Sequence, residues 1–373
     1  GGGGAGLTAA YSAAEQGAKV MLIEKGSVLG GNTLVSGTAY NAADPQAQAN
    51  MILTEAQKTA LDGYLALSAA DPSLKLDEFP EWAEVLKKLK SEINDFYRVN
   101  KGKSAGVDMP GFDSVTLHLW HIYTGGLRPL QNGTTVAPKL ELAKKLAESS
   151  LDTFEWMDEI GLEARFGGEI DGIGTAPGAL WPRTHSFMHG AMRIPILVYQ
   201  ASEVGVEFST ETCGTELLKD AEGRVIGAKA VRADGTKITV HTAKGVILAT
   251  GGCSANPSMI MERDKYWGDL LNGCTLSTNM GTNTGDGIAM AEAIGADVTG
   301  TTVQITPFAE PYKGTITDGV WADAAEQIWI DGSGKRFVDE YAATDVLADA
   351  VLNLPDSVFF VIYAGHGDVD RPV

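Results

Sequence analysis

Cysteine is scarce in this sequence, with 3 residues in 373. Cys213, Cys253 and Cys274 lie far apart and form no CxxC, CxxCH or zinc-type spacing. The sequence therefore contains no motif for covalent haem, for an iron–sulfur cluster or for structural zinc, and we expect no metal site. An odd number of cysteines also argues against a disulfide framework.

Basic side chains and long apolar runs are also few. The sequence has 29 Lys and Arg residues against 48 Asp and Glu residues, which gives a formal net charge of −19 at pH 7. A negative surface repels a phosphate backbone, so we expect no nucleic acid partner. No apolar run approaches the ~18 residues that a membrane-spanning helix needs, so the sequence predicts no membrane-spanning segment.

Glycine, by contrast, is abundant, with 45 residues, and the sequence opens on GGGGAG. Gly1, Gly3 and Gly6 match the pattern GxGxxG, in which glycines permit a tight turn, a close approach to a pyrophosphate and close helix packing. A helix is predicted over 7–16 and ends before Gly17, a residue type that commonly follows a helix. Because such a turn normally follows a strand, we expect the natural chain to begin before this sequence.

An acidic residue stands where a dinucleotide site needs one. A short apolar strand is predicted over 19–23, and Glu24 follows it, 18 residues after Gly6. A carboxylate at this strand end hydrogen-bonds a ribose hydroxyl and repels a 2′-phosphate. The glycine turn and the carboxylate together predict a dinucleotide site, and they leave open whether the dinucleotide is FAD or NAD.

The rest of the chain alternates between helical and strand-like patterns. Helices are predicted over 51–104, as a pair over 138–160, and over 194–204 and 288–294. Strands are predicted over 206–208, 225–231, 237–242 and 245–249, with turns at Glu222-Gly223 and Asp234-Gly235. The Gly- and Pro-rich stretch 162–192 predicts a long loop, a kind of segment that often carries function.

Five motifs occur in the order found in one known family. They are Glu24-Lys25, Gly30-Gly31-Asn32-Thr33, Ala249-Thr250-Gly251-Gly252, Thr284-Gly285-Asp286-Gly287 and Gly334-Lys335-Arg336-Phe337-Val338-Asp339-Glu340. With these motifs the chain resembles the FAD domain of the fumarate reductase and succinate dehydrogenase flavoproteins, and it is nearest to the soluble flavocytochrome c fumarate reductases and the urocanate reductases. The resemblance covers nearly the whole chain and implies FAD as the cofactor.

The resemblance also implies which residues contact FAD. Together with the glycine turn, the implied set is Gly1, Gly3, Ala5, Gly6, Glu24, Lys25, Gly31, Asn32, Thr33, Gly37, Thr38, Ala39, His185, Gly214, Ala249, Thr250, Gly251 and Asp286. The small residues at 37–39 would lie near the isoalloxazine ring, and Gly214 would lie on the adenine side. Asp286 would lie near the ribityl or pyrophosphate region, although an Asp at this point is also a common helix N-cap.

An α/β fold follows from the same resemblance. Residues 1–302 are expected to form a Rossmann-like FAD-binding domain with a parallel sheet and a β-meander, lacking its first strand and its C-terminal segment. Residues 303–373 are expected to begin an α+β capping domain that takes part in the substrate site.

The fumarate site of the family is not preserved. Thr306 stands where the family has a His before a Pro, and Trp321 stands where it has an Arg. Thr344 occupies the position of the proton-donating Arg of the family. Because Thr neither binds a dicarboxylate as Arg does nor delivers a proton, we expect fumarate not to be the substrate.

Another residue must then supply the proton if the reaction is still a reduction of C=C. His189 replaces a glycine in the loop that the family places over the flavin, and it adds a group that titrates near neutral pH. Tyr312, Asp318 and Arg183 are further candidates. The plain alternative for each is a hydrogen-bonded loop residue.

Several other side chains have both a structural and a functional interpretation. His118 and His121, which flank Trp120, are expected to pack a helix face. Four aromatic side chains are expected either to wall an apolar or aromatic substrate pocket or to belong to the core. These are Trp181, Phe187, Trp321 and Trp329.

The leading hypothesis is an FAD-dependent reductase that transfers hydride from flavin N5 to the activated C=C bond of an unsaturated small molecule. We expect this substrate to be neither fumarate nor succinate, and to be larger and aromatic or apolar. The electrons would come from another module or protein that carries flavin or haem. A dehydrogenase of the ketosteroid type and a flavoprotein subunit that mainly transfers electrons are the alternatives.

Overall fold

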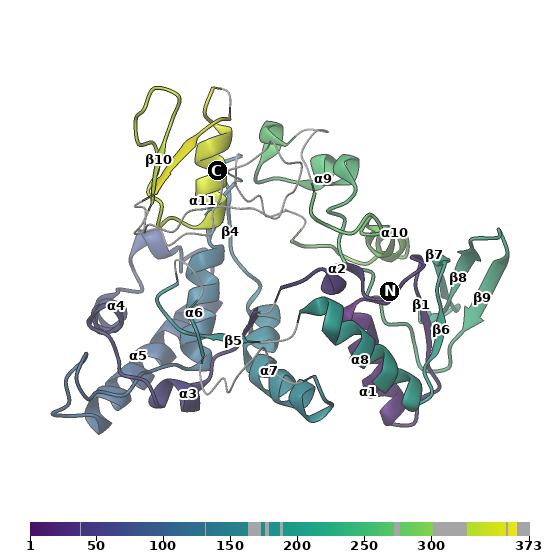
Figure 1. The fold of residues 1–373 in the computed structure, drawn as a ribbon, viewed down its shortest axis with the longest axis horizontal. Helices are drawn as coiled ribbons and strands as arrows, with labels where there is room; N and C mark the ends of the chain where they lie inside the picture. The colour runs from purple at the N-terminus through teal and green to yellow at the C-terminus, as the bar shows by residue number, and fades with distance from the viewer. Residues whose placement is uncertain are drawn as a thin grey trace. The chain divides into compact units, whose positions relative to one another are not determined.

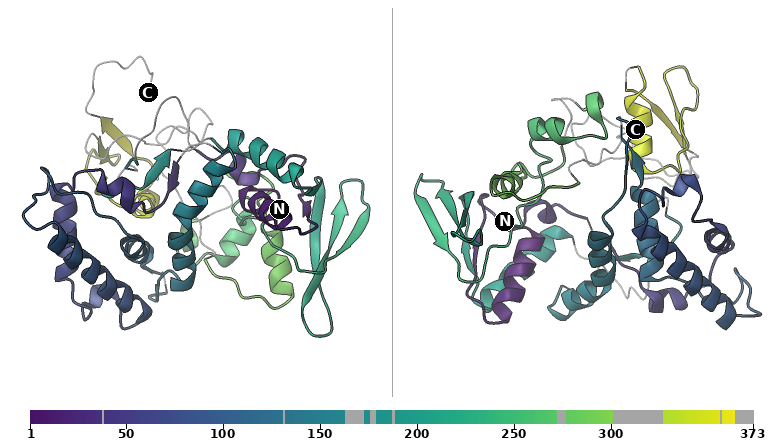
Figure 2. Two further views of the ribbon diagram at one scale, coloured as in Figure 1. Left: turned by 90° about the horizontal axis from the view of Figure 1, so that it is seen from below. Right: turned by 180° about the vertical axis from the view of Figure 1, so that it is seen from behind.

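The computed structural model describes residues 1–37, 39–130, 132–162, 173–175, 179–186, 189–271, 277–300, 327–355 and 357–363. The chain forms two compact units (Figures 1 and 2). The first unit comprises 1–38, 157–166 and 187–303, and the second comprises 39–156, 167–186 and 304–373. Each unit is therefore built from stretches that are not contiguous in the sequence.

A parallel strand pair and two helices form the first part of the first unit. Strand β1 (Met21–Ile23) pairs in parallel with β6 (Glu207–Ser209). Helix α1 (Gly4–Glu15) lies beside α8 (Gly190–Glu203), as Figure 1 shows. Each helix buries a stripe at helical spacing, which explains why the two pack together. The stripes are Leu7, Ala10, Tyr11 and Ala14 on α1 and Gly190, Ile194, Leu197 and Ala201 on α8.

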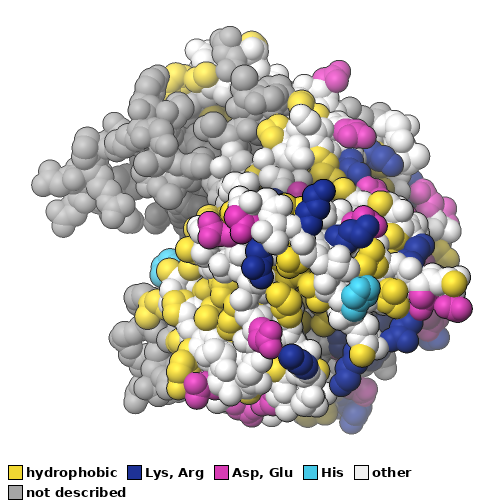
Figure 3. Space-filling view, turned by 90° about the vertical axis from the view of Figure 1, so that its right-hand side faces the viewer, with side chains coloured by type: hydrophobic (Ala, Val, Ile, Leu, Met, Phe, Trp, Pro, Cys, Tyr) yellow, Lys and Arg dark blue, Asp and Glu magenta, His cyan; other side chains and the backbone are white. Residues whose placement is uncertain are grey.

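An antiparallel meander forms the second part of this unit. Its strands are β7 (Thr212–Lys219), β8 (Val225–Arg232) and β9 (Lys237–His241). The turns between them contain Gly223 and Gly235, both at φ 84°, a conformation that favours glycine. Figure 3 views the molecule from the side of the meander and shows acidic and basic side chains interspersed among hydrophobic ones.

Short helices complete the first unit. They are α2 (Gly31–Leu34), α9 (Pro257–Arg263), the 3-10 turn η2 (Gly268–Leu270) and α10 (Asp286–Ala293). Helix α10 packs against β7, and the Cβ that an alanine would add at Gly287 would lie 2.0 Å from Thr250 Oγ1. The start of α10 therefore lies directly on the Ala249-Thr250 segment.

The second unit is mainly helical. Its helical elements are α3 (Pro45–Ala49), α4 (Glu55–Ala66), the 3-10 turn η1 (Pro72–Leu74), α5 (Glu81–Val99), α6 (Val115–Gly126), α7 (Leu140–Glu159) and α11 (Thr344–Leu352). Trp82, Leu89 and Ile93 of α5 pack with Trp120 and Tyr123 of α6 in a fully buried cluster. The rings of Trp82 and Tyr123 stack with their centroids 4.7 Å apart.

Three short antiparallel pairs accompany these helices. They are β2 (Ala39–Asn41) with β5 (Thr184–Ser186), β3 (Arg128–Pro129) with β4 (Thr135–Val136), and β10 (Gln327–Ile330) with β11 (Phe360–Tyr363). In the described part of the chain, no helix is both long and apolar enough to cross a membrane.

The predicted α/β fold is confirmed; of the expected parallel sheet the described residues form the pair β1-β6, and the expected meander is β7-β8-β9. Two local predictions are wrong. The stretch 138–160 forms one helix, α7, because no Gly or Pro interrupts it before Gly161. The stretch 245–249 forms no strand, and its Ile247 side chain is 68% exposed, because no strand among the described residues pairs with it. The prediction also missed β7. The division into domains at residue 303 stays a prediction.

Candidate functional site

The glycine turn at the start of α1 is shaped by contacts that leave no room for side chains. A Cβ at Gly1 would lie 2.1 Å from the carbonyl oxygen of Ala249, and one at Gly6 would lie 1.8 Å from the carbonyl oxygen of Gly1. At Gly3 the nearest atom to such a Cβ is Gly30 O, at 3.5 Å. Gly1 and Gly6 are thus required by packing, whereas the backbone at Gly3 borders space that a Cβ would fill.

The beginning of α1 is suited to an anion. Gly3 is its N-cap and makes no side-chain capping bond, and the Gly4 amide donates to Thr33 Oγ1 at 3.1 Å. The first amides of an α-helix have no partner within the helix, and the helix dipole adds positive potential at this end. A pyrophosphate placed there meets donors and favourable potential, as in other dinucleotide sites.

Glu24 closes this turn from the end of β1. Its Oε2 accepts from the Gly2 amide and its Oε1 accepts from the Gly26 amide, both at 2.7 Å. The side chain is buried, so these bonds fix its position. Each carboxylate oxygen retains a second acceptor site, which a ribose hydroxyl can use.

Lys25 and Asp286 form an ion pair across the site. Lys25 Nζ lies 2.5 Å from Asp286 Oδ2 and also bonds the hydroxyl of Thr284, which donates to Asp286 Oδ1 at 2.9 Å. The N-cap of α10 is Gly285, at φ 85°, so the alternative interpretation of Asp286 as the N-cap is wrong. Asp286 instead links the strand end that carries Glu24 to the start of α10.

Helix α2 supplies a third side of the site. The side-chain Nδ2 of Asn32 donates to Asn279 Oδ1 at 2.5 Å. The side-chain Oδ1 of Asn32 accepts from the backbone amide of Met280 at 2.8 Å. A Cβ added at Gly190 would lie 1.6 Å from the carbonyl oxygen of Thr33. The N-terminus of α8 therefore packs directly on α2.

Two side chains of α8 reach the segment that follows α2. His189 is the N-cap of α8, is exposed, and places Nδ1 3.4 Å from the carbonyl oxygen of Ser36. Arg193, one turn further, donates from Nη2 to Ser36 Oγ at 2.7 Å and to Gly37 O at 3.1 Å. The sequence reasoning missed Arg193, although its i+4 spacing from His189 places both residues on one face of the helix.

Two further predicted FAD contacts of this unit are glycines, and Gly251 lies near a buried polar group. Gly251 adopts φ +73°, and a Cβ there would lie 3.3 Å from Asn283 Oδ1. That oxygen is buried and has no hydrogen-bond partner among the described residues. Gly214 lies in β7, where a Cβ would lie 3.5 Å from Met290 Cε. Asn283, which the sequence reasoning did not single out, thus presents an acceptor beside this glycine.

The space at Gly3, the open first turn of α1 and the fixed Glu24 carboxylate fit a dinucleotide cofactor. The structure brings these together in the first unit with Ala5, Lys25, Gly31, Asn32, Thr33, Ala249, Thr250 and Asp286. Thr38 lies outside the described residues. Individual contacts between these residues and FAD stay predictions.

Ala39 and His185 belong to the second unit, in β2 and β5. His185 is buried, with Nε2 3.3 Å from Asp44 Oδ2 and its ring centroid 4.5 Å from that of Phe154. These contacts fix the imidazole within the second unit.

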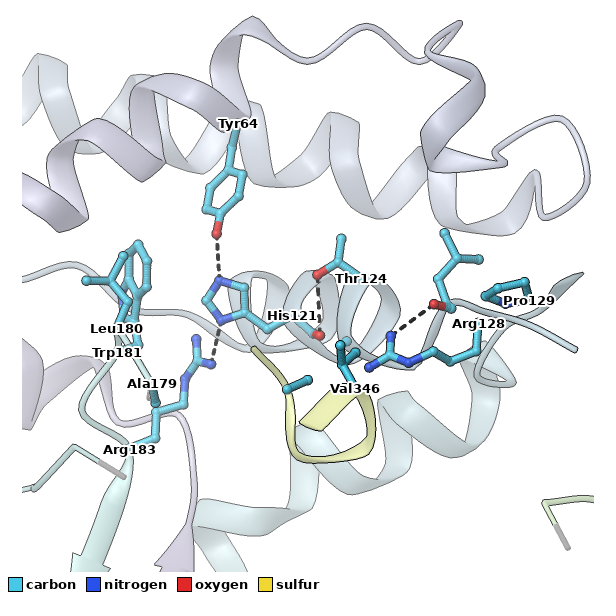
Figure 4. Close-up of a pocket in the computed structure, with 13 residues that line it drawn as sticks. Tyr64, His121, Thr124, Arg128, Pro129, Ala179, Leu180, Trp181, Arg183 and Val346 are labelled. Atoms are coloured by element: carbon cyan, nitrogen blue, oxygen red, sulfur yellow. Dashed lines mark hydrogen bonds between the residues drawn. The ribbon is translucent and has the colours of Figure 1, made fainter. Parts of the chain in front are cut away.

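A cavity of about 780 Å³ lies in the second unit (Figure 4). It is lined by Tyr64, His121, Thr124, Gly125, Leu127, Arg128, Pro129, Ala179, Leu180, Trp181, Arg183, Ala343 and Val346. Of the aromatic side chains expected at a pocket wall, Trp181 lies here, whereas Trp329 of β10 is buried, with its ring centroid 4.7 Å from that of Phe359. His121 lines this cavity in addition to lying on a helix face.

Arg183 is the centre of a buried polar network beside the cavity. Its Nε and Nη2 donate to the two carboxylate oxygens of Asp113 at 2.8 and 2.6 Å. Its Nη1 lies 2.8 Å from His121 Nδ1, and His121 Nε2 lies 3.0 Å from Tyr64 Oη. Burial, with the Arg183 charge as the second cause, lowers the pKa of His121 to about 3.

The other catalytic candidates are placed as follows. Tyr312 and Asp318 lie outside the described residues, as do Thr306, Trp321 and Phe187. Thr344 is the first residue of α11. The next residue, Asp345, accepts from Arg128 Nε at 2.5 Å and from Arg128 Nη2 at 3.0 Å.

The chain matches the family described as FAD binding domain over residues 1–358. It is 33% identical to NADH:acrylate oxidoreductase of Vibrio harveyi over 366 residues, which is 97% of this chain and 35% of that protein. The chain thus spans about a third of the length of this curated relative.

Two solved structures share the fold. The open conformation of a flavocytochrome c3 fumarate reductase aligns with a TM-score of 0.61 at 22% identity, over 97% of this chain and 51% of that one. A 3-ketosteroid Δ4-(5α)-dehydrogenase from Rhodococcus jostii RHA1 aligns with a TM-score of 0.60 at 21% identity, over 97% of this chain and 64% of that one.

Proposed function

The chain belongs to the family of FAD-binding domains, with FAD as its cofactor, and from this premise we propose that it is the flavin-carrying part of an oxidoreductase that reduces an activated C=C bond. The observation that carries the proposal is the site of the first unit, where the glycine turn, the α1 N-terminus and Glu24 converge. The bound flavin supplies hydride from N5. The residues of the chain bind and orient the reactants and provide a proton.

The residues proposed to bind FAD follow from their positions. The first turn of α1 would receive the pyrophosphate, and Glu24 would accept from a ribose hydroxyl. The pair Lys25 and Asp286, which joins the strand end to α10, would keep both elements in place around the cofactor. Arg193 would fix the backbone at Ser36 and Gly37, near which the isoalloxazine is proposed to lie.

The proposed substrate is a small, unsaturated molecule other than fumarate. Thr344 stands where the resemblance implies a proton-donating arginine, and Thr lacks both the charge and the acidic proton for that role. The similar protein from Vibrio harveyi is named for acrylate, in which one carboxylate activates the C=C bond, and this supports an enoate with fewer than two carboxylates. His189 is the proposed acid, with Tyr312 and Asp318 as further candidates.

The proposed electron donor is a second module or protein that carries flavin or haem. The chain spans 35% of the length of the acrylate oxidoreductase, so the donor module is sought in the remainder of the natural protein or in a partner.

The test is anaerobic reoxidation of the dithionite-reduced, full-length holoprotein by a panel of substrates. We expect acrylate or another enoate to reoxidise the flavin rapidly and fumarate to do so at a negligible rate. Rapid reoxidation by fumarate would contradict the substrate assignment. Turnover of saturated ketosteroids with artificial acceptors would favour a dehydrogenase, an alternative that is supported by a shared fold. No turnover with any compound would favour an electron-transfer subunit.

A further inference from the structure

We propose that the cavity of the second unit is a binding site for an uncharged aromatic molecule that carries a carbonyl or similar hydrogen-bond acceptor. The inference rests on the chemistry of the cavity walls and is independent of the proposed function.

Both arginines at the cavity already have a carboxylate partner. Arg183 binds both oxygens of Asp113, whose side chain is completely buried. Arg128 binds both oxygens of Asp345 in the same two-pronged geometry. A carboxylate ligand would have to compete with these bidentate pairs, which are the strongest form of this interaction. The cavity therefore offers little net charge and favours an uncharged ligand.

The neutral network fixes the direction of one hydrogen-bond donor. Arg183 can only donate, so its contact at 2.8 Å requires Nδ1 of His121 to be the acceptor. Because burial keeps His121 neutral at physiological pH, its single ring proton is then on Nε2. This N–H donates to Tyr64 Oη at 3.0 Å, so the hydroxyl proton of Tyr64 is directed elsewhere.

In the proposal, that proton is donated to an acceptor of the ligand in the cavity. Tyr64 and His121 both line the cavity, and Figure 4 shows the chain from Arg183 through His121 to Tyr64 along its wall. Among the described residues, no hydrogen bond from Tyr64 to another acceptor is present. A ligand carbonyl at this position would accept the hydroxyl proton and complete the chain.

Apart from Thr124, whose hydroxyl donates to the carbonyl oxygen of Trp120, the rest of the lining is mainly apolar and includes a fixed aromatic ring. Trp181 is buried, and its indole N–H donates to the carbonyl oxygen of Phe112 at 2.8 Å, which sets the plane of the ring. Its centroid lies 5.1 Å from that of His121 and 6.3 Å from that of Tyr64. Leu180 and Val346 add aliphatic surface. A flat aromatic ligand gains both apolar contact and ring packing here.

The test uses 4-fluorobenzamide and 4-fluorobenzoate with the FAD-loaded protein, followed by ¹⁹F NMR. The two probes have the same ring and differ in charge, and neither has a C=C bond that the flavin could reduce. We expect the amide to bind and the carboxylate to bind at least about tenfold more weakly. If neither probe binds as expected, the proposed reductase function is unaffected. If the reductase test fails, the binding of the probes is likewise unaffected.

Two variants locate the binding. Tyr64→Phe removes only the hydroxyl and should weaken amide binding by about five- to tenfold, the size expected for one neutral hydrogen bond. Val346→Trp places an indole ring on the cavity wall and should weaken amide binding by obstructing part of the site. Tyr97→Phe is the matched control, because the Tyr97 hydroxyl donates to the exposed Asp62 in the same group of helices.

Three results would overturn the inference. These are tighter binding of the carboxylate than of the amide, equal amide affinity in wild type and Tyr64→Phe, and no binding of either probe.

Discussion

A Cβ at Gly6 would lie 1.8 Å from the carbonyl oxygen of Gly1, whereas a Cβ at Gly3 would meet no atom closer than 3.5 Å. The two glycines belong to one sequence motif, yet the structure assigns them different roles. Gly6 permits α1 to pack on the turn. Gly3 leaves space beside the first amides of the helix.

This difference predicts opposite outcomes for two alanine variants. Gly3→Ala should fold with nearly unchanged stability and lose FAD, because the methyl group would occupy the space proposed for the pyrophosphate. Gly6→Ala should be strongly destabilised even without FAD, because backbone atoms must move. Flavin content and urea unfolding of the apoproteins measure the two effects. Full FAD occupancy in Gly3→Ala would place the cofactor elsewhere.

The carboxylate of Glu24 is expected to contribute to FAD affinity through its charge. Glu24→Gln retains the size of the side chain and removes the charge-assisted hydrogen bonds. FAD should therefore bind about ten- to a hundredfold more weakly, which corresponds to a loss of ~1.5–3 kcal/mol of binding free energy. Titration of the apoprotein with FAD gives the dissociation constant. Glu15→Gln, on the exposed end of α1, serves as the control and should bind FAD normally.

The buried pair of Arg183 and Asp113 should be important for stability. Asp113→Asn leaves the guanidinium without its compensating charge, which should lower the free energy of unfolding by about 3–5 kcal/mol. The exposed pair of Glu84 and Lys87 gives the comparison, since each side chain is 77% exposed. Glu84→Gln should change stability by less than about 1 kcal/mol. Equal effects of the two substitutions in urea unfolding would contradict this assignment.

Two histidines of α6 should make the protein less stable in mild acid. Burial lowers the pKa of His118 to about 4 and that of His121 to about 3, from 6.5. Between pH 6.5 and these values, the unfolded chain binds protons that the folded chain does not. The free energy of unfolding should therefore fall as the pH falls, by up to ~1.4 kcal/mol per pH unit for each histidine, and the loss should end below the folded pKa values.

His121→Gln tests this relationship, because glutamine does not titrate. Its stability should be lower than that of wild type at neutral pH, and its slope between about pH 6 and pH 5 should be roughly half the wild-type slope. Urea unfolding at several pH values gives both quantities. An unchanged slope would show that His121 is protonated equally in the folded and unfolded states.

His189 is the proposed acid in the reduction of substrate. It forms no side-chain cap on α8, so His189→Ala should leave the helix and FAD binding intact. The rate of flavin reoxidation by the substrate should fall by ~10²–10⁴-fold. A variant with normal kcat and an unshifted pH profile would transfer the role to Tyr312 or Asp318.

The parts of the site that are close in sequence were predictable from the sequence. The glycine turn, α1, β1 and Glu24 lie within the first 24 residues, and each carries a local signal. The network of Tyr64, His121 and Arg183 joins residues that are 57 and 62 positions apart, and no local pattern links them. The same limitation explains the error at 245–249, where the apolar pattern indicates a strand but does not indicate its neighbour.

The chain contributes to the two units in alternation, and this has a consequence for synthesis. Strand β1 pairs with β6 across more than 180 positions, and Lys25 meets Asp286 across 261. Neither unit can finish folding on the ribosome while only its first stretch has emerged. Pairings between such distant segments slow folding, because the loops must close before contacts stabilise them. The packing of the early glycine turn against Ala249 therefore forms only after residues that are synthesised much later have emerged.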